Sequence, residues 1–179
     1  MAENTKYKRP RVNPARSLPE KVFEAFSLVF LLYTVAASVY ILISYKTAIP
    51  SHFAFSGYPD SMADKSFAAV YLFLAILGYI FFCIVERSQW VLRYSVEITE
   101  NNAEAVYKTR RMMDVVLKTE TMALIAYYIF GTDFIARKIF TSMLPYFQFV
   151  AIGLIAVTVV VFVMRLDKVY KQFEEKTSD

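Results

Sequence analysis

The residues best suited to chemistry lie in one short stretch, positions 49–65, which reads IPSHFAFSGYPDSMADK. The stretch contains His52, which is the single histidine of the chain, together with the carboxylate of Asp60 and the cation of Lys65. A histidine side chain titrates near neutral pH, and a nearby carboxylate favours its charged form. We therefore consider three kinds of chemistry for this stretch: metal binding, proton transfer and recognition of a polar partner.

Metal-dependent catalysis is the weakest of the three. A catalytic zinc takes three protein ligands and a water molecule, whereas His52 and Asp60 supply only two. A third ligand would have to come from Asp64 or Asp133. The sequence also shows no set of nucleophile, general base and orienting group. We therefore expect a protein that is not an enzyme and that holds neither a metal nor a cofactor.

The surrounding sequence is typical of an integral membrane protein. Hydrophobic residues make up 57% of the 179 residues. About 20 helical residues cross the hydrocarbon core of a bilayer, which is roughly 30 Å thick. Three charge-free runs have this length, at Ala25–Tyr45, Ser66–Val85 and Ile139–Met164. We expect each run to form a transmembrane helix, so the lipid bilayer is the first expected partner.

A fourth expected span is more polar. The charge-free segment Thr121–Thr132 covers only about 18 Å as a helix. The span must therefore extend to about residues 115–135, and it includes Lys118, Glu120 and Asp133. Ionisable residues within a span often have a function, and Glu120 is the first candidate. Since all three lie near an end of the span, we expect their side chains to snorkel towards the membrane surface.

These elements predict an all-α fold with one membrane domain, residues 21–165, built as a four-helix bundle. The spans are expected at about residues 23–44, 66–85, 115–135 and 144–164. The basic segment 1–20 is too polar to fold by itself, so we expect it to be disordered. It either binds acidic lipid or only sets the orientation of the first span. A charged tail, residues 166–179, follows the last span.

The basic residues predict the orientation. Sixteen lysines and arginines lie in the N-terminal segment, after the second span, in the third span and in the C-terminal tail, and four lie in the other two connections. Connections rich in lysine and arginine remain in the cytoplasm. We therefore expect both termini in the cytoplasm and the His52 loop outside. Because the basic residues flank spans, we expect no binding of nucleic acid.

Local patterns predict how the 49–65 loop folds. Pro50 disfavours helix in the residue before it, so the first span must end there. Gly57 and the Tyr-Pro-Asp sequence at 58–60 predict a tight turn, and either Asp60 or Ser61 can cap the next helix. If the loop binds no partner, we expect it to be a compact irregular structure at the membrane surface, in which the polar groups hydrogen-bond to one another.

Two further helix starts are predicted from single residues. Thr99 is a candidate N-cap, with Glu100 in the first turn, for a cytoplasmic helix that continues without a break into the third span. Pro145 suits the first turn of the fourth span, where its missing N–H is tolerated.

The 49–65 loop resembles the motif of a bacterial membrane domain of unknown function that is found in SdpI-type immunity proteins. The motif has the form IP-x-HFN-x-x-G-x-x-D-x-x-x-x-K. The matching residues are Ile49, Pro50, His52, Phe53, Gly57, Asp60 and Lys65. Ala54 stands where the motif has asparagine. The chain therefore looks like a short, four-span form of this family.

A second segment, TENNAEAVYKTRR at 99–111, is similar to another part of the same family. The matching residues, expected on the cytoplasmic helix, are Thr99, Glu100, Asn102, Ala103, Glu104, Tyr107, Arg110 and Arg111. The resemblance implies a protein of the bacterial plasma membrane that protects against a secreted toxic peptide or signals its presence.

Two kinds of function remain open besides the weakly supported metal enzyme. In the first, the outward loop binds an extracytoplasmic peptide or a membrane-protein partner and signals to the cytoplasmic helix. In the second, His52, Asp60 and Glu120 form a proton or cation relay in a small transporter or a transporter accessory subunit.

Overall fold

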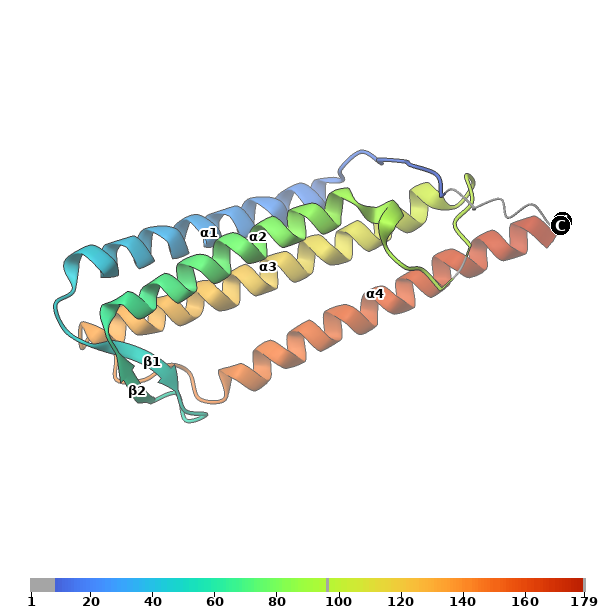
Figure 1. Ribbon diagram of the computed structural model, residues 1–179. Coiled ribbons are helices and arrows are strands. Elements are labelled where there is room, and N and C mark those ends of the chain that lie inside the picture. The colour runs from blue at the N-terminus through green and yellow to red at the C-terminus, as the bar shows by residue number, and fades with distance from the viewer. Residues whose placement is uncertain (1–8, 96, 179) are drawn as a thin grey trace, which may run out of the picture.

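The computed structural model describes residues 9–95 and 97–178 of the chain. The described chain is mostly helical, with the long helices α1 (Leu18–Ser44), α2 (Ala68–Arg87), α3 (Ala103–Ala136) and α4 (Phe147–Ser178). Helices α1, α2 and α3 pack side by side, and α4 packs on α3 (Figure 1). The chain is therefore an elongated helical bundle in which α3 contacts each of the other three long helices.

Three helical segments are long and apolar enough to cross a membrane, at Leu18–Ser44, Lys65–Arg87 and Phe147–Glu175. Their outer faces expose large apolar side chains such as those of Phe26, Phe73 and Val150. A soluble domain rarely exposes so much contiguous apolar surface, whereas lipid contact accommodates it. The prediction of three strongly apolar helices is confirmed.

Helix α3 is more polar, and several of its charged side chains lie inside the bundle. Lys118 and Asp133 are both buried, so the expectation that they snorkel to the membrane surface is wrong. They are instead covered by neighbouring elements and paired there. The Asp133 carboxylate lies 2.7 Å from the Arg137 guanidinium and accepts a hydrogen bond from the Tyr45 hydroxyl at 2.7 Å. The helix itself is continuous, as predicted.

The connection between α1 and α2 is a β-hairpin, so the prediction of an all-α fold with an irregular loop is wrong here. Strand β1 (Ile49–Phe53) pairs antiparallel with β2 (Pro59–Ala63), with an irregular register around His52. The tight turn lies before Pro59 instead of including it. Strand pairing satisfies backbone N–H and C=O groups that are costly to leave unbonded beside a membrane.

Asp64 caps the helical segment after the hairpin, instead of Asp60 or Ser61 as predicted. Its Oδ1 accepts a hydrogen bond from the Ser66 backbone N–H at 2.9 Å, at the start of the short 3-10 helix η1 (Lys65–Phe67) that leads into α2. This bond holds the pKa of the Asp64 carboxyl below its usual range. Asp60 is unsuited to the role because it belongs to β2.

Two other helix starts also differ from the predictions. Helix α3 follows Asn102 instead of Thr99, and the Asn102 side chain accepts a hydrogen bond from the Thr99 N–H at 2.9 Å. Helix α4 begins at Phe147, after Pro145, because Tyr146 has a left-handed backbone conformation with a φ of 57°.

The segment that precedes α1 is docked on α3 over its described part. The Tyr107 hydroxyl donates to the Pro10 carbonyl at 3.0 Å. The Arg111 guanidinium donates to the carbonyls of Pro14 at 2.8 Å and Ala15 at 3.3 Å. The predicted disordered tail is therefore wrong for residues 9–17, and residues 18–20 belong to α1. Residues 1–8 lie outside the described residues.

Four charged side chains form a closed cluster between α1, α2 and α3, which we call the four-charge cluster. The Lys118 ammonium lies 2.6 Å from Glu24 Oε2 and 2.6 Å from Glu86 Oε1. The Arg16 guanidinium bridges the same two carboxylates, at 3.2 Å and 3.0 Å. The Tyr79 hydroxyl donates to Glu24 Oε1 at 2.8 Å. The cluster contains two positive and two negative charges.

The four-charge cluster fixes the positions of three helices relative to one another along the bundle axis. Glu24 belongs to α1, Glu86 to α2 and Lys118 to α3, and the side chains of Lys118 and Glu86 are 0% exposed. A buried charge is tolerated only when it is paired and hydrogen-bonded. Sliding any of these helices along its axis would leave a charge without a partner, so such shifts are strongly disfavoured.

We expect Lys118→Met to lower the free energy of unfolding by about 3–5 kcal/mol, because it leaves the buried Glu86 and half-buried Glu24 carboxylates with a single counter-ion. Unfolding of the purified chain in detergent measures the loss. Adding Glu86→Gln should restore part of it by removing the excess negative charge. Lys21→Met, at an exposed position of α1, is the matched control and should change stability by less than about 0.5 kcal/mol. Equal losses for the two lysines would contradict the pairing.

Candidate functional site

The hairpin is fixed to the connection between α3 and α4. The Met143 N–H donates to the Gly57 carbonyl at 2.9 Å, and the Tyr146 N–H donates to the Phe55 carbonyl at 2.7 Å. Segments almost 90 positions apart in sequence therefore share backbone hydrogen bonds at one end of the bundle (Figure 1). These bonds hold the hairpin turn in one position relative to the helices.

Gly57 is required at this turn for two separate reasons. Its φ of 85° lies in the left-handed region, which side chains with a Cβ rarely adopt. A Cβ at this position would also lie 2.2 Å from the Met143 carbonyl oxygen, far inside van der Waals contact. The motif glycine thus allows the close approach of two backbones.

Two other motif residues attach the first strand to the bundle. The Phe53 side chain is buried against Met143 and Phe147. The Pro50 carbonyl accepts a hydrogen bond from the Thr132 hydroxyl at 3.3 Å. The roles that we find for Pro50, Phe53 and Gly57 are therefore structural.

His52 and Asp60 point away from this packed side and face each other across the two strands. His52 Nδ1 lies 2.6 Å from Asp60 Oδ1, and their side chains are 70% and 47% exposed. The pair combines a ring nitrogen and a carboxylate, which are hydrogen-bonding groups of different types. Such a pair can bind a polar or charged group on a partner. Lys65 lies apart from it, half-buried at the start of η1.

A metal centre needs more ligands than this pair provides. Within residues 9–95 and 97–178, no three side chains of the histidine, cysteine, aspartate and glutamate types come close enough to hold a metal ion. What the pair offers is hydrogen bonding and charge.

The second predicted motif, at 99–111, divides in the same way into buried and exposed positions. Tyr107 and Arg111 hold the segment before α1, and Arg111 also pairs with Glu20 at 2.8 Å. Asn102 is buried at the start of α3, and Arg110 lies 3.3 Å from Asp114. The exposed members are Thr99, Glu100 and Glu104. The roles that we find for the contacting residues are again structural.

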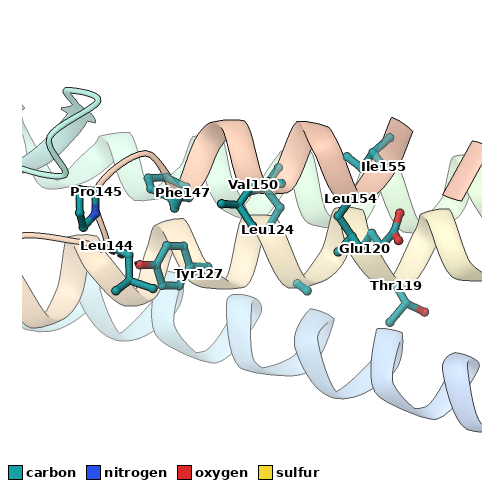
Figure 2. Close-up of a pocket in the computed structure, with 12 residues that line it drawn as sticks. Thr119, Glu120, Leu124, Tyr127, Leu144, Pro145, Phe147, Val150, Leu154 and Ile155 are labelled. Atoms are coloured by element: carbon teal, nitrogen blue, oxygen red, sulfur yellow. Dashed lines mark hydrogen bonds between the residues drawn. The ribbon is translucent and has the colours of Figure 1, made fainter. Parts of the chain in front are cut away.

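Glu120 lies in a different place, on the wall of a pocket between α3 and α4 (Figure 2). The pocket has a volume of about 560 Å³ and is lined mainly by apolar side chains, among them Leu124, Tyr127 and Leu154. Glu120 Oε1 accepts a hydrogen bond from the Thr158 hydroxyl of α4 at 2.6 Å. Figure 2 shows Glu120 near one end of the pocket and Pro145 near the other.

The structure therefore brings His52 and Asp60 together but not Glu120. The hairpin end is filled by a cluster of Phe53, Met143 and Phe147, with Tyr127 and Tyr128 packed against it. The apolar and aromatic side chains of this cluster lie between the hairpin and Glu120, and they provide few hydrogen-bonding groups that could carry a proton between them. The geometry accordingly favours a binding role for the pair over the relay.

The sequence interpretation missed the four-charge cluster and the Glu120–Thr158 contact. A signal for the cluster was present, since Glu24, Glu86 and Lys118 each lie within a few residues of the same end of their expected spans. Opposite charges at one depth in neighbouring spans are candidates for pairing. The partner of Glu120 depends on how α4 packs on α3, which the sequence does not reveal.

Comparison of the chain with protein-family models, with curated proteins and with solved structures finds no match.

We expect Gly57→Ala to destabilise the chain by about 2 kcal/mol or more, since it adds backbone strain and a steric clash at the hairpin turn. Thermal unfolding in detergent measures the effect. Gly153→Ala is the matched control, because a Cβ on this α4 glycine meets nothing within 4 Å. The control should be neutral or stabilising by up to about 1 kcal/mol, as alanine favours helix. Similar effects at both glycines would show that the turn does not need glycine.

Proposed function

We propose that the chain is a four-span membrane protein with both termini in the cytoplasm. Four basic residues, Lys46, Lys65, Arg137 and Lys138, lie at or next to the hairpin end of the bundle. The other basic residues of the described part of the chain lie elsewhere, and most are near the opposite end. This asymmetry supports an orientation in which the hairpin faces away from the cytoplasm.

The packing of α3 supports its role as the fourth span. A charged helix can cross a membrane when its charges face the protein interior and are paired. Lys118 is paired within the four-charge cluster, and Asp133 is paired with Arg137. The neighbouring helices α1, α2 and α4 supply the apolar outer surface.

The function that we propose for this protein is recognition of an extracytoplasmic peptide or protein through the hairpin. The observation that carries it is the exposed His52–Asp60 pair on a hairpin that is otherwise fixed by buried contacts. A rigid support limits the entropy lost on binding. We find no structural need for an exposed ion pair on this face, because exposed pairs contribute little stability.

The surface around the pair suits an amphipathic peptide. Phe55, Tyr58 and Met62 are each more than half exposed on the same hairpin. Aromatic and methionine side chains beside a few polar groups are typical of recognition surfaces. The sequence resemblance to SdpI-type immunity proteins supports a secreted toxic peptide as the ligand, with protection of the cell as the outcome.

The proposal predicts that the pair is needed for protection but not for folding. Sensitive bacterial cells that express the chain are challenged with culture supernatants from peptide-producing bacteria. We expect His52→Ala and Asp60→Asn to abolish protection while changing the unfolding free energy by less than about 0.5 kcal/mol, because both positions are exposed. Ser61→Ala, at the exposed position next to Asp60 in β2 and opposite His52 in the strand pairing, is the control and should retain protection.

Full protection by both variants would contradict recognition through the pair. If the unaltered chain protects against none of the supernatants, the immunity part of the proposal is contradicted.

A further inference from the structure

Three basic side chains gather at the end of the bundle opposite the hairpin. Lys108 of α3 and Arg165 and Lys168 of α4 line one cavity of about 440 Å³. Ser17 and Pro19, at the start of α1, close its side. All three basic residues are exposed at their positions.

Several other basic residues at this end of the bundle are paired with carboxylates. Arg16, Arg110, Arg111 and Lys171 each lie within 3.3 Å of a carboxylate. Over the described residues, no ion pair joins Lys108, Arg165 or Lys168 to a carboxylate. Mutual repulsion of three like charges around one cavity is relieved when an anion binds there. The cavity thus has the charge to attract a phosphate group.

The cavity lies at the boundary between polar and apolar surface. Arg165 directly follows the apolar run that ends at Met164, and Leu18 is 75% exposed at the start of α1. In a membrane protein this is the depth of the lipid headgroups. Basic pockets between helices at this depth are suited to anionic lipid headgroups.

The basic cavity and the pocket of Figure 2 both lie against α3 and α4, and we call the line along α3 that joins them the groove, which offers a place for an acyl chain. Met112 and Phe162 form the apolar side of the basic cavity. On α3, Lys108, Met112, Thr119 and Ala123 follow one face of the helix, and the last two line the pocket of Figure 2. The rise from Met112 to Ala123 is about 16 Å, close to half of the roughly 30 Å hydrocarbon core.

We propose that this groove is a binding site for one anionic phospholipid. Its phosphate lies among Lys108, Arg165 and Lys168, and one acyl chain follows the groove towards the pocket that contains Glu120. The site rests on the chain's being a membrane protein and is independent of what the hairpin recognises.

Native mass spectrometry of the full chain, released from detergent with phosphatidylglycerol or phosphatidylcholine, tests the headgroup site. We expect the chain to retain phosphatidylglycerol preferentially, and the triple variant Lys108→Gln, Arg165→Gln, Lys168→Gln to lose at least about tenfold in affinity, since each basic residue near an anionic surface contributes roughly fivefold. The control triple variant Lys21→Gln, Arg87→Gln, Lys171→Gln removes the same charge from the same end and should lose much less. Equal losses in the two triple variants, or no preference for phosphatidylglycerol, would overturn the proposal.

A second arm tests the acyl chain. Ala123→Phe fills the groove and should lower phosphatidylglycerol retention severalfold, whereas Gly153→Phe, at an α4 position where an added Cβ meets nothing within 4 Å, should not. Soluble glycerol phosphate should fail to compete, since it lacks a chain. The proposal would be overturned if glycerol phosphate competed, or if Ala123→Phe left phosphatidylglycerol retention unchanged. It would also be overturned if the chain formed dimers that dissociated only in the groove variants, since the groove would then bind a second copy of the chain. Lys168→Gln alone repeats the headgroup test if the triple variant does not fold.

Discussion

The pairing of buried charges is the constraint on which the rest of this structure depends. Lys118 has two carboxylate partners on different helices, Glu24 on α1 and Glu86 on α2. Apolar contacts between helices tolerate sliding, because one aliphatic side chain replaces another at small cost. A buried ammonium does not tolerate it, because losing a partner costs several kcal/mol. The four-charge cluster therefore sets the axial register of α1, α2 and α3.

This register has consequences at the far end of the bundle. The cluster fixes the axial positions of α1 and α2. The hairpin that joins these helices therefore contacts the α3–α4 connection, where the backbones of Gly57 and Met143 approach each other. Helix α4 stands outside the four-charge cluster and is attached through this connection, through apolar packing and through contacts such as that between Glu120 and Thr158. Its looser attachment leaves room for the groove beside α3, while the hairpin end stays rigid enough to present His52.

The sequence predicted the long apolar helices, but it failed for several local boundaries and for the contacts between distant residues. Three apolar helices can be predicted from run length, and His52 and Asp60, which lie in one short loop of the sequence, are 2.6 Å apart in the structure. The hairpin was missed because its strands are only five residues long and contain little alternation. The role of Gly57 depends on Met143, and the burial of Lys118 depends on two other helices. Such contacts follow from packing, which single-sequence patterns do not encode.

The most direct measurement is the accessibility of the hairpin in intact cells. With Cys83→Ala as background, single cysteines are introduced by Ser61→Cys in β2 and by Glu100→Cys before α3, both at exposed positions. We expect a membrane-impermeant maleimide to label the first reporter in intact cells and the second only after the membrane is permeabilised. Labelling of the Glu100→Cys reporter alone in intact cells would contradict outward presentation of the His52–Asp60 pair, and with it the proposed recognition site.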